Sequence, residues 1–400
     1  MGNLVGTFAE GLDLAFVHAA FRSRSVTRRA RAVAVVERME QAAGLYQDAA
    51  TSGRLFARPE PLREVQTCFI RALPEGEVVD LRWPSRFPST CSSYDQWLAR
   101  CPKTQTAHAR WFRREKPGSA LICLHGYGVG AFPIEEQAFQ ANWLYRLGLD
   151  VIFVTLPFHA RRGQHPWARP LFPAADPFCS NDGFAQAVYD VRALVGFLRQ
   201  NGIRRVAVTG MSLGGFTASL LATVEPEIDV VIPIVPFASL PRIIWEHGEG
   251  TEGRRKVEEA GLSLELFEKA HAATTPLCRD PVISAERILL IGGERDRVTP
   301  LSHAIALRDH FTRDCTSPRL HTFPGSHLIQ SGRRSVFGTL ARFLAARELI
   351  SRRDAAELRE PARRRPTLVG SHTGHLGRAV KIAWAPTSAL SRAVVSRRPH

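Results

Sequence analysis

The pentapeptide Gly210-Met211-Ser212-Leu213-Gly214 places a serine between two glycines, directly after an apolar run at residues 206–209. A serine hydroxyl becomes a strong nucleophile when a sharp turn between a strand and a helix holds it beside a base, and that turn crowds the backbone. The two glycines leave the space that such a turn requires. A helical pattern follows at residues 216–224, so we predict a nucleophile elbow that presents Ser212. A chance match in a loop is the alternative, and the surrounding strand and helix patterns disfavour it.

A reactive serine also needs a base and an acid that orients the base. In strand-and-helix folds with this elbow, the partners come in the order serine, acid, histidine, each on a loop after a later strand. Asp296 lies in the polar segment after a strand-like run at residues 288–291, and His327 follows a second run at residues 320–323. We therefore predict Asp296 as the acid and His327 as the base.

Other residues compete for both roles. Glu294 lies two residues before Asp296 and is the alternative acid. His321 lies within the last strand-like run and His159 follows an earlier one, and both positions also suit ordinary hydrogen-bonded histidines. His327 stands just past a strand end in a Gly-Ser turn, and this position at the active edge of a sheet favours it as the base.

The negative oxygen of a tetrahedral intermediate needs hydrogen-bond donors. We expect these to be the backbone N–H groups of Leu213, at the start of the elbow helix, and of Tyr127, after His125-Gly126. Backbone donors aimed at developing charge contribute roughly 3 to 4 kcal/mol each in such sites. The Tyr127 side chain is alternatively a wall of the pocket, and His125 is expected to support the loop without titrating.

The elements that position these residues predict a mostly parallel sheet. Strand patterns at residues 78–83 and 109–113 lead into a buried strand, after which helices alternate with apolar strands. About fifty charged and helix-forming residues separate the strands that end near residue 235 and begin near residue 288. We predict a helical lid at residues 237–285, with a plain helical connection as the alternative. The other strands are expected at residues 120–124, 151–155, 206–209, 230–235, 288–291 and 320–323, which makes eight in all.

Four motifs together resemble the α/β-hydrolase superfamily over residues 77–345. They are L-H-G-Y-G at 124–128, G-M-S-L-G-G at 210–215, G-x-x-D-x-x-T-P at 293–300 and G-S-H at 325–327. The resemblance implies an α/β-hydrolase fold with an eight-stranded, mostly parallel sheet and helices on both faces. It also implies Ser212, Asp296 and His327 as the catalytic triad.

Within that superfamily, the chain is closest in style to the esterase, dienelactone-hydrolase-like and prolyl-oligopeptidase-like branches. Ser212 departs from the cysteine of true dienelactone hydrolases. A serine also argues against dehalogenase and epoxide hydrolase chemistry, because the elbows of those enzymes carry aspartate.

The loop after residues 151–155 carries His159, Arg161 and Arg162. By topology this loop borders the pocket, so we expect these side chains to contact substrate, with the arginines recognising a carboxylate or phosphate. Two solvated arginines in an arginine-rich protein are an equally good interpretation. His159 equally suits a structural, hydrogen-bonded role.

The net charge of +15 does not by itself indicate a nucleic-acid partner. Residues 352–398 hold 11 basic and 3 acidic residues, about half of the excess, without repeated interleaving of basic and aromatic residues. We therefore expect a small acyl substrate and no nucleic acid. A membrane surface, reached through the basic tail, is a less favoured partner. The sequence is silent on oligomeric state.

Seven cysteines without a C-x-x-C pair argue against a disulfide framework and against a zinc site. The predicted serine chemistry requires neither a metal nor an organic cofactor. No run approaches about 20 uninterrupted apolar residues, and the apolar segment at residues 12–21 precedes its arginines, the wrong order for a secretory signal. A cytoplasmic protein is therefore expected.

Three regions are predicted along the chain. Residues 1–75 form an N-terminal helical extension that packs on the core and includes an amphipathic helix at residues 26–48. Residues 76–349 form the catalytic domain, and residues 350–400 form a basic, poorly ordered tail.

The expected function is a serine hydrolase that cleaves a carboxylic ester, thioester or amide through an acyl-enzyme intermediate. A non-catalytic binding protein with the same fold and a membrane-surface lipase are the alternatives.

Overall fold

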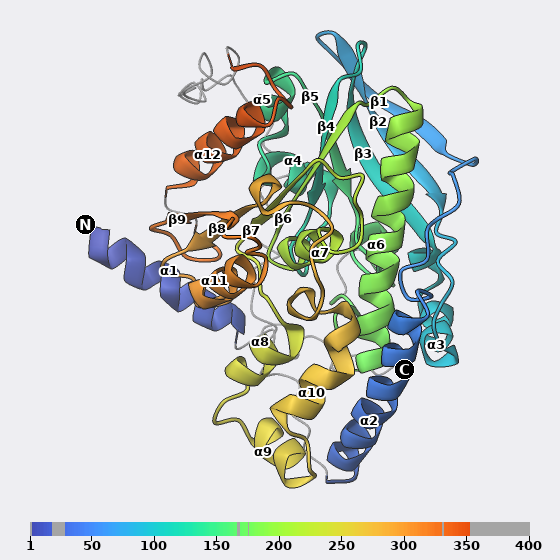
Figure 1. Ribbon diagram of the computed structural model, residues 1–400, viewed down its shortest axis with the longest axis vertical. Helices are drawn as coiled ribbons and strands as arrows, with labels where there is room; N and C mark the ends of the chain where they lie inside the picture. Colours follow the sequence, from blue (N-terminus) through green and yellow to red (C-terminus); the bar gives the residue numbers. More distant parts are fainter. Residues whose placement is uncertain (1, 18–28, 166–168, 175, 330–331, 353–400) are drawn as a thin grey trace, which may run out of the picture. The chain divides into compact units, whose positions relative to one another are not determined.

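The computed structural model describes residues 2–17, 29–165, 169–174, 176–329 and 332–352 of the 400-residue chain. Within these ranges, nine strands form one sheet in the order β1-β2-β3-β5-β4-β6-β7-β8-β9 (Figure 1). The strands are β1 (Gln66–Leu73), β2 (Gly76–Pro84), β3 (Thr106–Arg114), β4 (Ser119–Leu124), β5 (Leu149–Val154), β6 (Arg205–Met211), β7 (Val230–Ile234), β8 (Leu289–Gly293) and β9 (Arg319–Phe323).

The first part of the sheet is antiparallel and the second part is parallel. The pairs β1–β2, β2–β3 and β3–β5 are antiparallel, whereas β4 pairs parallel with both β5 and β6, and parallel pairing continues to β9. The order of the strands therefore reverses at β4, and the loops after β4 and β6 leave the same edge side by side. Ligands bind at such switch points in open α/β sheets, beyond the carboxyl ends of the strands.

Helices cover both faces of the sheet because successive residues of a strand point to opposite sides. In β4, Ile122 and Leu124 pack into one apolar core, and Leu121 and Cys123 pack into the other. The first core includes residues of α3 (Ser92–Arg100), α6 (Pro177–Gln200), α7 (Leu213–Leu221) and α11 (Leu301–His310). The second includes residues of α4 (Phe132–Ala138), α5 (Ala141–Arg146) and α12 (Arg333–Ala346).

β1 is a strand that the sequence analysis did not predict, so the expected count of eight is wrong by one. Its residues are mostly exposed, since it pairs only with β2 at the edge of the sheet. An edge strand that buries little needs no alternation of apolar and polar residues, which is the signal by which strands are recognised. β1 also lies in the region, residues 1–75, that was expected to be helical.

α2 (Arg29–Thr51) is the amphipathic helix expected at residues 26–48, and it packs on α6 and on the insertion after β7. Its buried stripe includes Ala32, Met39 and Tyr46, whereas the neighbouring Val33 is 40% exposed. One apolar cluster joins this helix to the insertion and to α6. Its buried members are Val36, Met39, Ala42, Ala43, Tyr46, Ala49, Leu55, Phe178, Ala185, Leu262, Phe267 and Ala270.

The insertion at residues 237–285 is helical, as expected. It contains α8 (Leu240–His247), α9 (Glu252–Glu259) and α10 (Leu264–His271), followed by short 3-10 turns. α8 contacts the carboxyl edge of the sheet, since His247 Nε2 lies 2.7 Å from the carbonyl oxygen of Val298 in the loop after β8. The insertion therefore reaches the edge at which the predicted acid lies.

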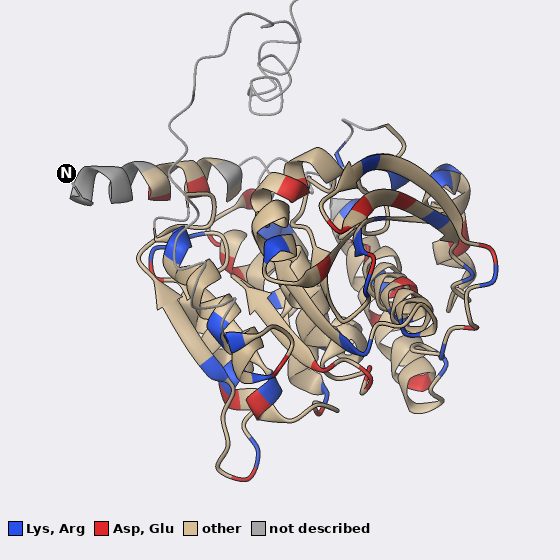
Figure 2. Cartoon of the chain, turned by 90° about the horizontal axis from the view of Figure 1, so that it is seen from above, with Lys and Arg blue, Asp and Glu red and all other residues tan. Residues whose placement is uncertain are grey.

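The chain divides into two compact units, residues 1–360 and 361–400, and the second lies outside the described residues. The predicted basic tail at residues 350–400 falls outside them too, apart from residues 350–352. Basic and acidic segments are interspersed over the described elements (Figure 2). In the described ranges, no helix has both the length and the apolar character needed to cross a membrane. The cytoplasmic location stays a prediction.

Candidate active site

Ser212 is the single residue between β6 and α7, and it has φ +54° and ψ −111°. Residues with a side chain rarely adopt a positive φ, so this is the strained turn expected of a nucleophile elbow. The Ser212 N–H donates to the Ile234 carbonyl at 2.9 Å, and the Ser212 carbonyl accepts from the Phe216 N–H at 2.9 Å. These two bonds fasten the turn to the end of β7 and to the first turn of α7.

The glycines on either side of Ser212 are required by the close approach of other backbone. An added Cβ at Gly210 would lie 2.3 Å from the carbonyl carbon of Gly214, and one at Gly214 would lie 2.1 Å from the carbonyl oxygen of Leu124. No side chain fits at these distances without pushing the elbow away from β4. The crowded turn is thus the physical reason for the G-x-S-x-G spacing.

Asp296 and His327 lie together at the carboxyl edge of the sheet. Asp296 follows β8, His327 follows β9, and the His327 Nδ1 atom lies 2.8 Å from Asp296 Oδ2. The Asp296 side chain is fully buried, and the His327 side chain is 8% exposed. A carboxylate at Nδ1 keeps the proton of a neutral imidazole on that atom, which leaves Nε2 free to accept a proton from a hydroxyl.

The loop after β8 holds the Asp296 carboxylate in one orientation. Its Oδ1 atom accepts the backbone N–H groups of Val298 (2.8 Å) and Thr299 (2.7 Å), and the Thr299 hydroxyl lies 3.0 Å from Oδ2. The same hydroxyl lies 3.1 Å from His327 Nδ1 and 2.9 Å from the Val235 carbonyl. Thr299 therefore contacts the acid, the base and the end of β7, a role that the sequence analysis did not assign.

Opposing effects set the protonation of His327. Burial alone lowers the pKa of the imidazole, but the charge and hydrogen bond of Asp296, together with the charge of Asp13, outweigh it and raise the pKa above its ordinary value. The imidazolium that forms when a base accepts a proton is thus stabilised here.

The end of β7 connects the elbow to the loop of the acid. The consecutive carbonyls of Ile234 and Val235 accept the Ser212 N–H and the Thr299 hydroxyl, each at 2.9 Å. Val235 has φ +43°, which is uncommon for a β-branched residue. This bent strand end therefore places the nucleophile and the loop of Asp296 against the same two peptide units.

Among the hydrogen bonds of the described residues, none joins the hydroxyl of Ser212 to the imidazole of His327. The imidazole contacts are those that Nδ1 makes with Asp296 and Thr299. Serine–histidine bonds of this type are often long before substrate binds. The proton transfer between the two residues is accordingly part of the proposal below.

The loop after β4 lies against the elbow. An added Cβ at Gly126 would lie 3.7 Å from the Ser212 Cβ, so the chain at this point is in van der Waals range of the nucleophile. Tyr127 follows Gly126 directly. Leu213 is the first residue of α7, so its N–H has no acceptor inside the helix. The two backbone donors expected for the oxyanion thus come from segments that flank Ser212.

His125 supports this loop as a neutral side chain. Its Nδ1 atom lies 2.7 Å from the Gly126 carbonyl and its Nε2 atom accepts the Leu156 N–H at 2.9 Å, so the proton resides on Nδ1. Burial lowers the pKa of His125 to about 4. The residue therefore does not titrate near neutral pH, as the sequence analysis expects.

Glu135 is a buried carboxyl that the sequence analysis missed. It lies in the first turn of α4, and its Oε1 atom accepts the Gly130 N–H at 2.9 Å, which holds the far end of the loop after β4. Burial raises its pKa from 4.5 to about 7, although the hydrogen bond acts in the opposite direction. Because the folded-state pKa is raised, protonation stabilises the fold fully below pH 4.5, and this contribution is lost as the pH rises to about 7.

Glu135→Gln is therefore expected to be more stable than wild type at pH 8, by about 1–3 kcal/mol, and similar to wild type at pH 4.5. The glutamine keeps an acceptor for Gly130 and carries no charge. Urea unfolding at both pH values measures the difference, with the exposed Glu115→Gln as the matched control. A stability gain that does not depend on pH would contradict the assignment.

The geometry separates the predicted pair from its rivals. Glu294 is exposed, and its Oε1 accepts the Thr322 hydroxyl at 2.9 Å. The His321 Nε2 atom lies 3.4 Å from the Ser335 hydroxyl. Neither residue takes part in the contacts around Asp296.

The loop at the pocket rim places its three predicted substrate-binding residues in different surroundings. His159 is fully buried, with Nδ1 2.8 Å from the Pro157 carbonyl and its ring edge-on to Tyr127 at 5.8 Å between centroids. Arg161 is exposed and lies 3.3 Å from Asp80. A contact of His159 or Arg161 with substrate stays a prediction.

The expectation that Arg162 contacts substrate is wrong. Its side chain is fully buried and lies 2.8 Å from the Asp190 carboxylate of α6. The guanidinium also donates to the carbonyls of Thr104 (2.6 and 3.1 Å) and Thr155 (3.1 Å). These contacts turn the side chain into the core and tie the loop to it, an orientation that sequence position alone does not reveal.

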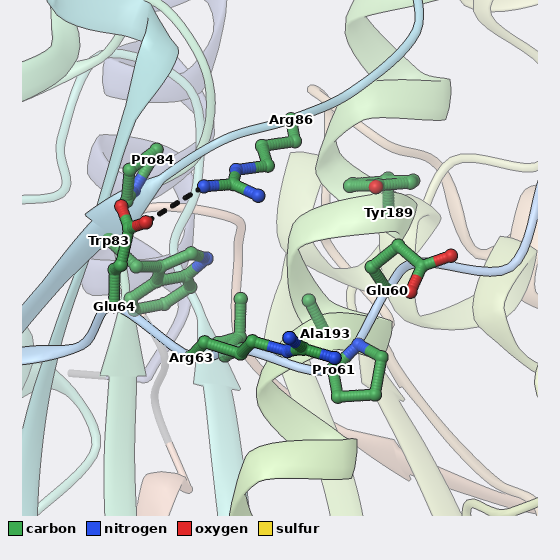
Figure 3. Close-up of a pocket in the computed structure, with 10 residues that line it drawn as sticks. Glu60, Pro61, Arg63, Glu64, Trp83, Pro84, Arg86, Tyr189 and Ala193 are labelled. Carbon is green, nitrogen blue, oxygen red and sulfur yellow. Dashed lines mark hydrogen bonds and ion pairs between the residues drawn. The ribbon is translucent and has the colours of Figure 1, made fainter.

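One small pocket lies apart from these loops, between residues 60–64, the end of β2 and α6 (Figure 3). Its volume of about 30 Å³ accommodates about one or two water molecules. The Arg86–Glu64 ion pair, 3.1 Å long, forms part of its lining. None of the predicted site residues lines this pocket, and it is too small for an acyl substrate.

Two family models match the chain. The model of the prolyl oligopeptidase family matches residues 185–345, and the model described as alpha/beta hydrolase domain containing 18 matches residues 87–244. Among curated proteins, an uncharacterized protein of Mycobacterium tuberculosis, present in two strains, is 29% identical over 280 residues. That match spans 68% of this chain and 65% of the length of the relative, which is less than two thirds.

Two solved structures illustrate the fold. Acetyl xylan esterase 1 from a Thermoanaerobacterium species is 19% identical with a TM-score of 0.51, covering 76% of this chain and 94% of that one. An acetyl xylan esterase from a Paenibacillus species is 16% identical with a TM-score of 0.52, covering 77% and 92%. At these identities the likeness concerns the fold. Together with the overlapping family matches, it shows that this chain has the α/β-hydrolase fold.

Proposed function

We propose that this protein is a serine hydrolase that cleaves a carboxylic ester through an acyl-enzyme intermediate. The observation that carries the proposal is the contact of 2.8 Å between His327 Nδ1 and Asp296 Oδ2, at the sheet edge that also carries the strained Ser212. A buried aspartate at Nδ1 of a histidine is the arrangement that turns Nε2 into a general base.

In the proposed reaction, the Ser212 hydroxyl attacks the substrate carbonyl while His327 Nε2 takes its proton. The backbone N–H groups of Leu213 and Tyr127 stabilise the oxyanion, and Asp296 stabilises the imidazolium. The imidazolium then protonates the leaving alcohol, and the ester of Ser212 remains. Water attacks this ester in the second half, with His327 again as base, which releases the acid and restores the serine.

Thioesters and amides react through the same steps, and the prolyl oligopeptidase family match keeps peptide amides among the substrates to be tested. The proposed substrate is a small acyl compound, and no nucleic acid is expected as a partner, since basic segments do not gather on the described elements (Figure 2).

A fluorophosphonate probe tests the proposal directly, because it labels a serine that is activated as a nucleophile. The wild-type protein is expected to be labelled once per chain, and the site of labelling, read by peptide mass spectrometry, is expected to be Ser212. A folded wild-type protein that resists the probe would instead support the non-catalytic binding protein.

A substrate panel then resolves the leaving group. We expect nitrophenyl esters of short acyl chains to be hydrolysed faster than long-chain esters and faster than peptide nitroanilides. A preference for long acyl chains that grows in the presence of vesicles would point to the membrane-surface lipase, and preferential cleavage of the amides would point to a peptidase.

A further inference from the structure

The N-terminal helix α1 (Gly2–Val17) inserts one fully buried carboxylate, that of Asp13, between the two loops that carry the acid and the base. Asp13 Oδ1 accepts the Ser326 hydroxyl and the Leu328 N–H, each at 3.1 Å. Asp13 Oδ2 accepts the N–H groups of His327 at 2.9 Å and of Arg297 at 3.1 Å. Three of these donors belong to the loop of the base, and the fourth follows Asp296 directly.

A buried carboxylate is costly unless its oxygens are hydrogen-bonded, and here each oxygen has two donors. The donors are backbone and hydroxyl groups rather than a cation, so the bonds restrain loop geometry more than they neutralise charge. Asp13 is separated from these loops by more than 280 residues of sequence, so α1 must dock for them to form.

Other contacts of α1 lie at the surface of the same region. Glu10 pairs with Arg297 at 3.1 Å, and both side chains are partly exposed. Glu10 and Asp13 are the charged residues of α1, and both are acidic (Figure 2). The partly exposed Glu10 pair contributes little on its own, because solvent screens it, so Asp13 is the charged residue of α1 whose contacts are buried.

We propose that Asp13 is a positioning residue that holds the catalytic base in place from the N-terminal helix, an inference that rests on the proposed function. The backbone of His327 is fixed on one side by Asp13, and its imidazole is fixed on the other side by Asp296. Without Asp13, the loop of the base loses three hydrogen bonds, and the imidazole keeps only the contacts of Nδ1 to hold Nε2 in place. The charge of Asp13 also raises the pKa of His327.

The experiment compares Asp13→Asn with the matched control Glu10→Gln, both in the full chain. An asparagine of the same shape offers one acceptor oxygen and turns its NH2 group towards donors. We expect kcat to fall roughly a hundredfold for Asp13→Asn with KM nearly unchanged, the scale of a misplaced catalytic group. The acid limb of the kcat/KM profile should move to lower pH, because a negative charge beside the base is lost. Glu10→Gln should stay within twofold of wild type in each measurement.

Hydrogen–deuterium exchange gives a readout that does not depend on activity. Peptides that cover residues 326–329 and 296–299 should exchange faster in Asp13→Asn, while β4 and β6 stay protected. A mere loss of global stability would instead lower the fraction of active protein, counted by probe labelling, and would leave the pH profile of that fraction in place. If Asp13→Asn fails to fold, the same measurements of kcat, pH profile and exchange are made on Asp13→Ala. The alanine leaves the backbone amides free to bind water.

Near-normal kcat in a folded Asp13 variant, with unchanged exchange at residues 326–329, would overturn the inference and leave the proposed function intact. Activity that survives the loss of Ser212 would instead overturn the proposed function. The exchange measurement would then still decide whether Asp13 restrains the loop of His327.

Discussion

Ser212→Ala is expected to lower kcat by about a million-fold, the scale observed when a serine triad is disabled, while the folded structure persists. The alanine removes the attacking oxygen and leaves the backbone of the elbow free to keep its bonds to Ile234 and Phe216. Steady-state hydrolysis of a nitrophenyl ester, normalised to folded protein, measures the loss. Labelling by a fluorophosphonate probe should disappear in the same variant.

Ser219→Ala is the matched control for this substitution. Ser219 lies in α7, is buried, and donates its hydroxyl to the Gly215 carbonyl at 2.9 Å within the helix. Its loss should lower stability by about 1 kcal/mol and leave kcat within a few-fold of wild type. Comparable activity of Ser212→Ala and wild type would show that another residue is the nucleophile and would end the proposal.

Asp296→Asn is expected to lower kcat by roughly ten thousand-fold, because it favours the wrong tautomer of the base. The asparagine oxygen can keep the two backbone N–H groups of Val298 and Thr299, which leaves its NH2 group facing His327 Nδ1. The imidazole then accepts at Nδ1 and carries its proton on Nε2. A protonated Nε2 cannot take the proton of Ser212.

The pH profile and a second variant sharpen this test. The neutral imidazole is the active form, so kcat/KM of the wild-type protein should rise as the pH passes the pKa of His327. Because that pKa is raised, the rise should occur at a higher pH than for an ordinary histidine. Glu294→Gln, which alters the exposed carboxylate two residues earlier, should stay within about threefold of wild type. A severe loss in Glu294→Gln together with an active Asp296→Asn would reverse the assignment of the acid.

Most of the sheet and the predicted partners of Ser212 follow from local sequence patterns, which can be recognised without a structure. Buried central strands are continuous apolar runs, and a strand followed by a glycine-flanked serine has few physical explanations. The same holds for the position of His327 just past the last strand. The contact between His327 and Asp296 follows because the ends of parallel strands gather at one edge of the sheet.

Residues that act through long-range contacts escaped the sequence analysis. Asp13 sits in a helix with only two charged residues and belongs to no motif, because its partners are three backbone N–H groups and one hydroxyl in two distant loops. Thr299 looks like an ordinary turn residue, although its position in the T-P pair of the acid motif is a signal. The prediction for Arg162 was wrong because a charged residue on a loop is expected to be exposed. Here a buried partner, Asp190, lies far from it in the sequence and pairs with it in the core.

α2 precedes both family matches, which together begin at residue 87, yet it supplies half of the buried side chains in the cluster shared with the insertion. A shortened protein that starts at residue 87 would lack the α2 side chains that pack on Leu262 and Phe267, and it would expose a hydrophobic patch to solvent. Such a patch promotes self-association. Truncation at residue 87, where the family matches begin, is therefore expected to give a protein that aggregates. The folded unit begins before the segment that the family models match.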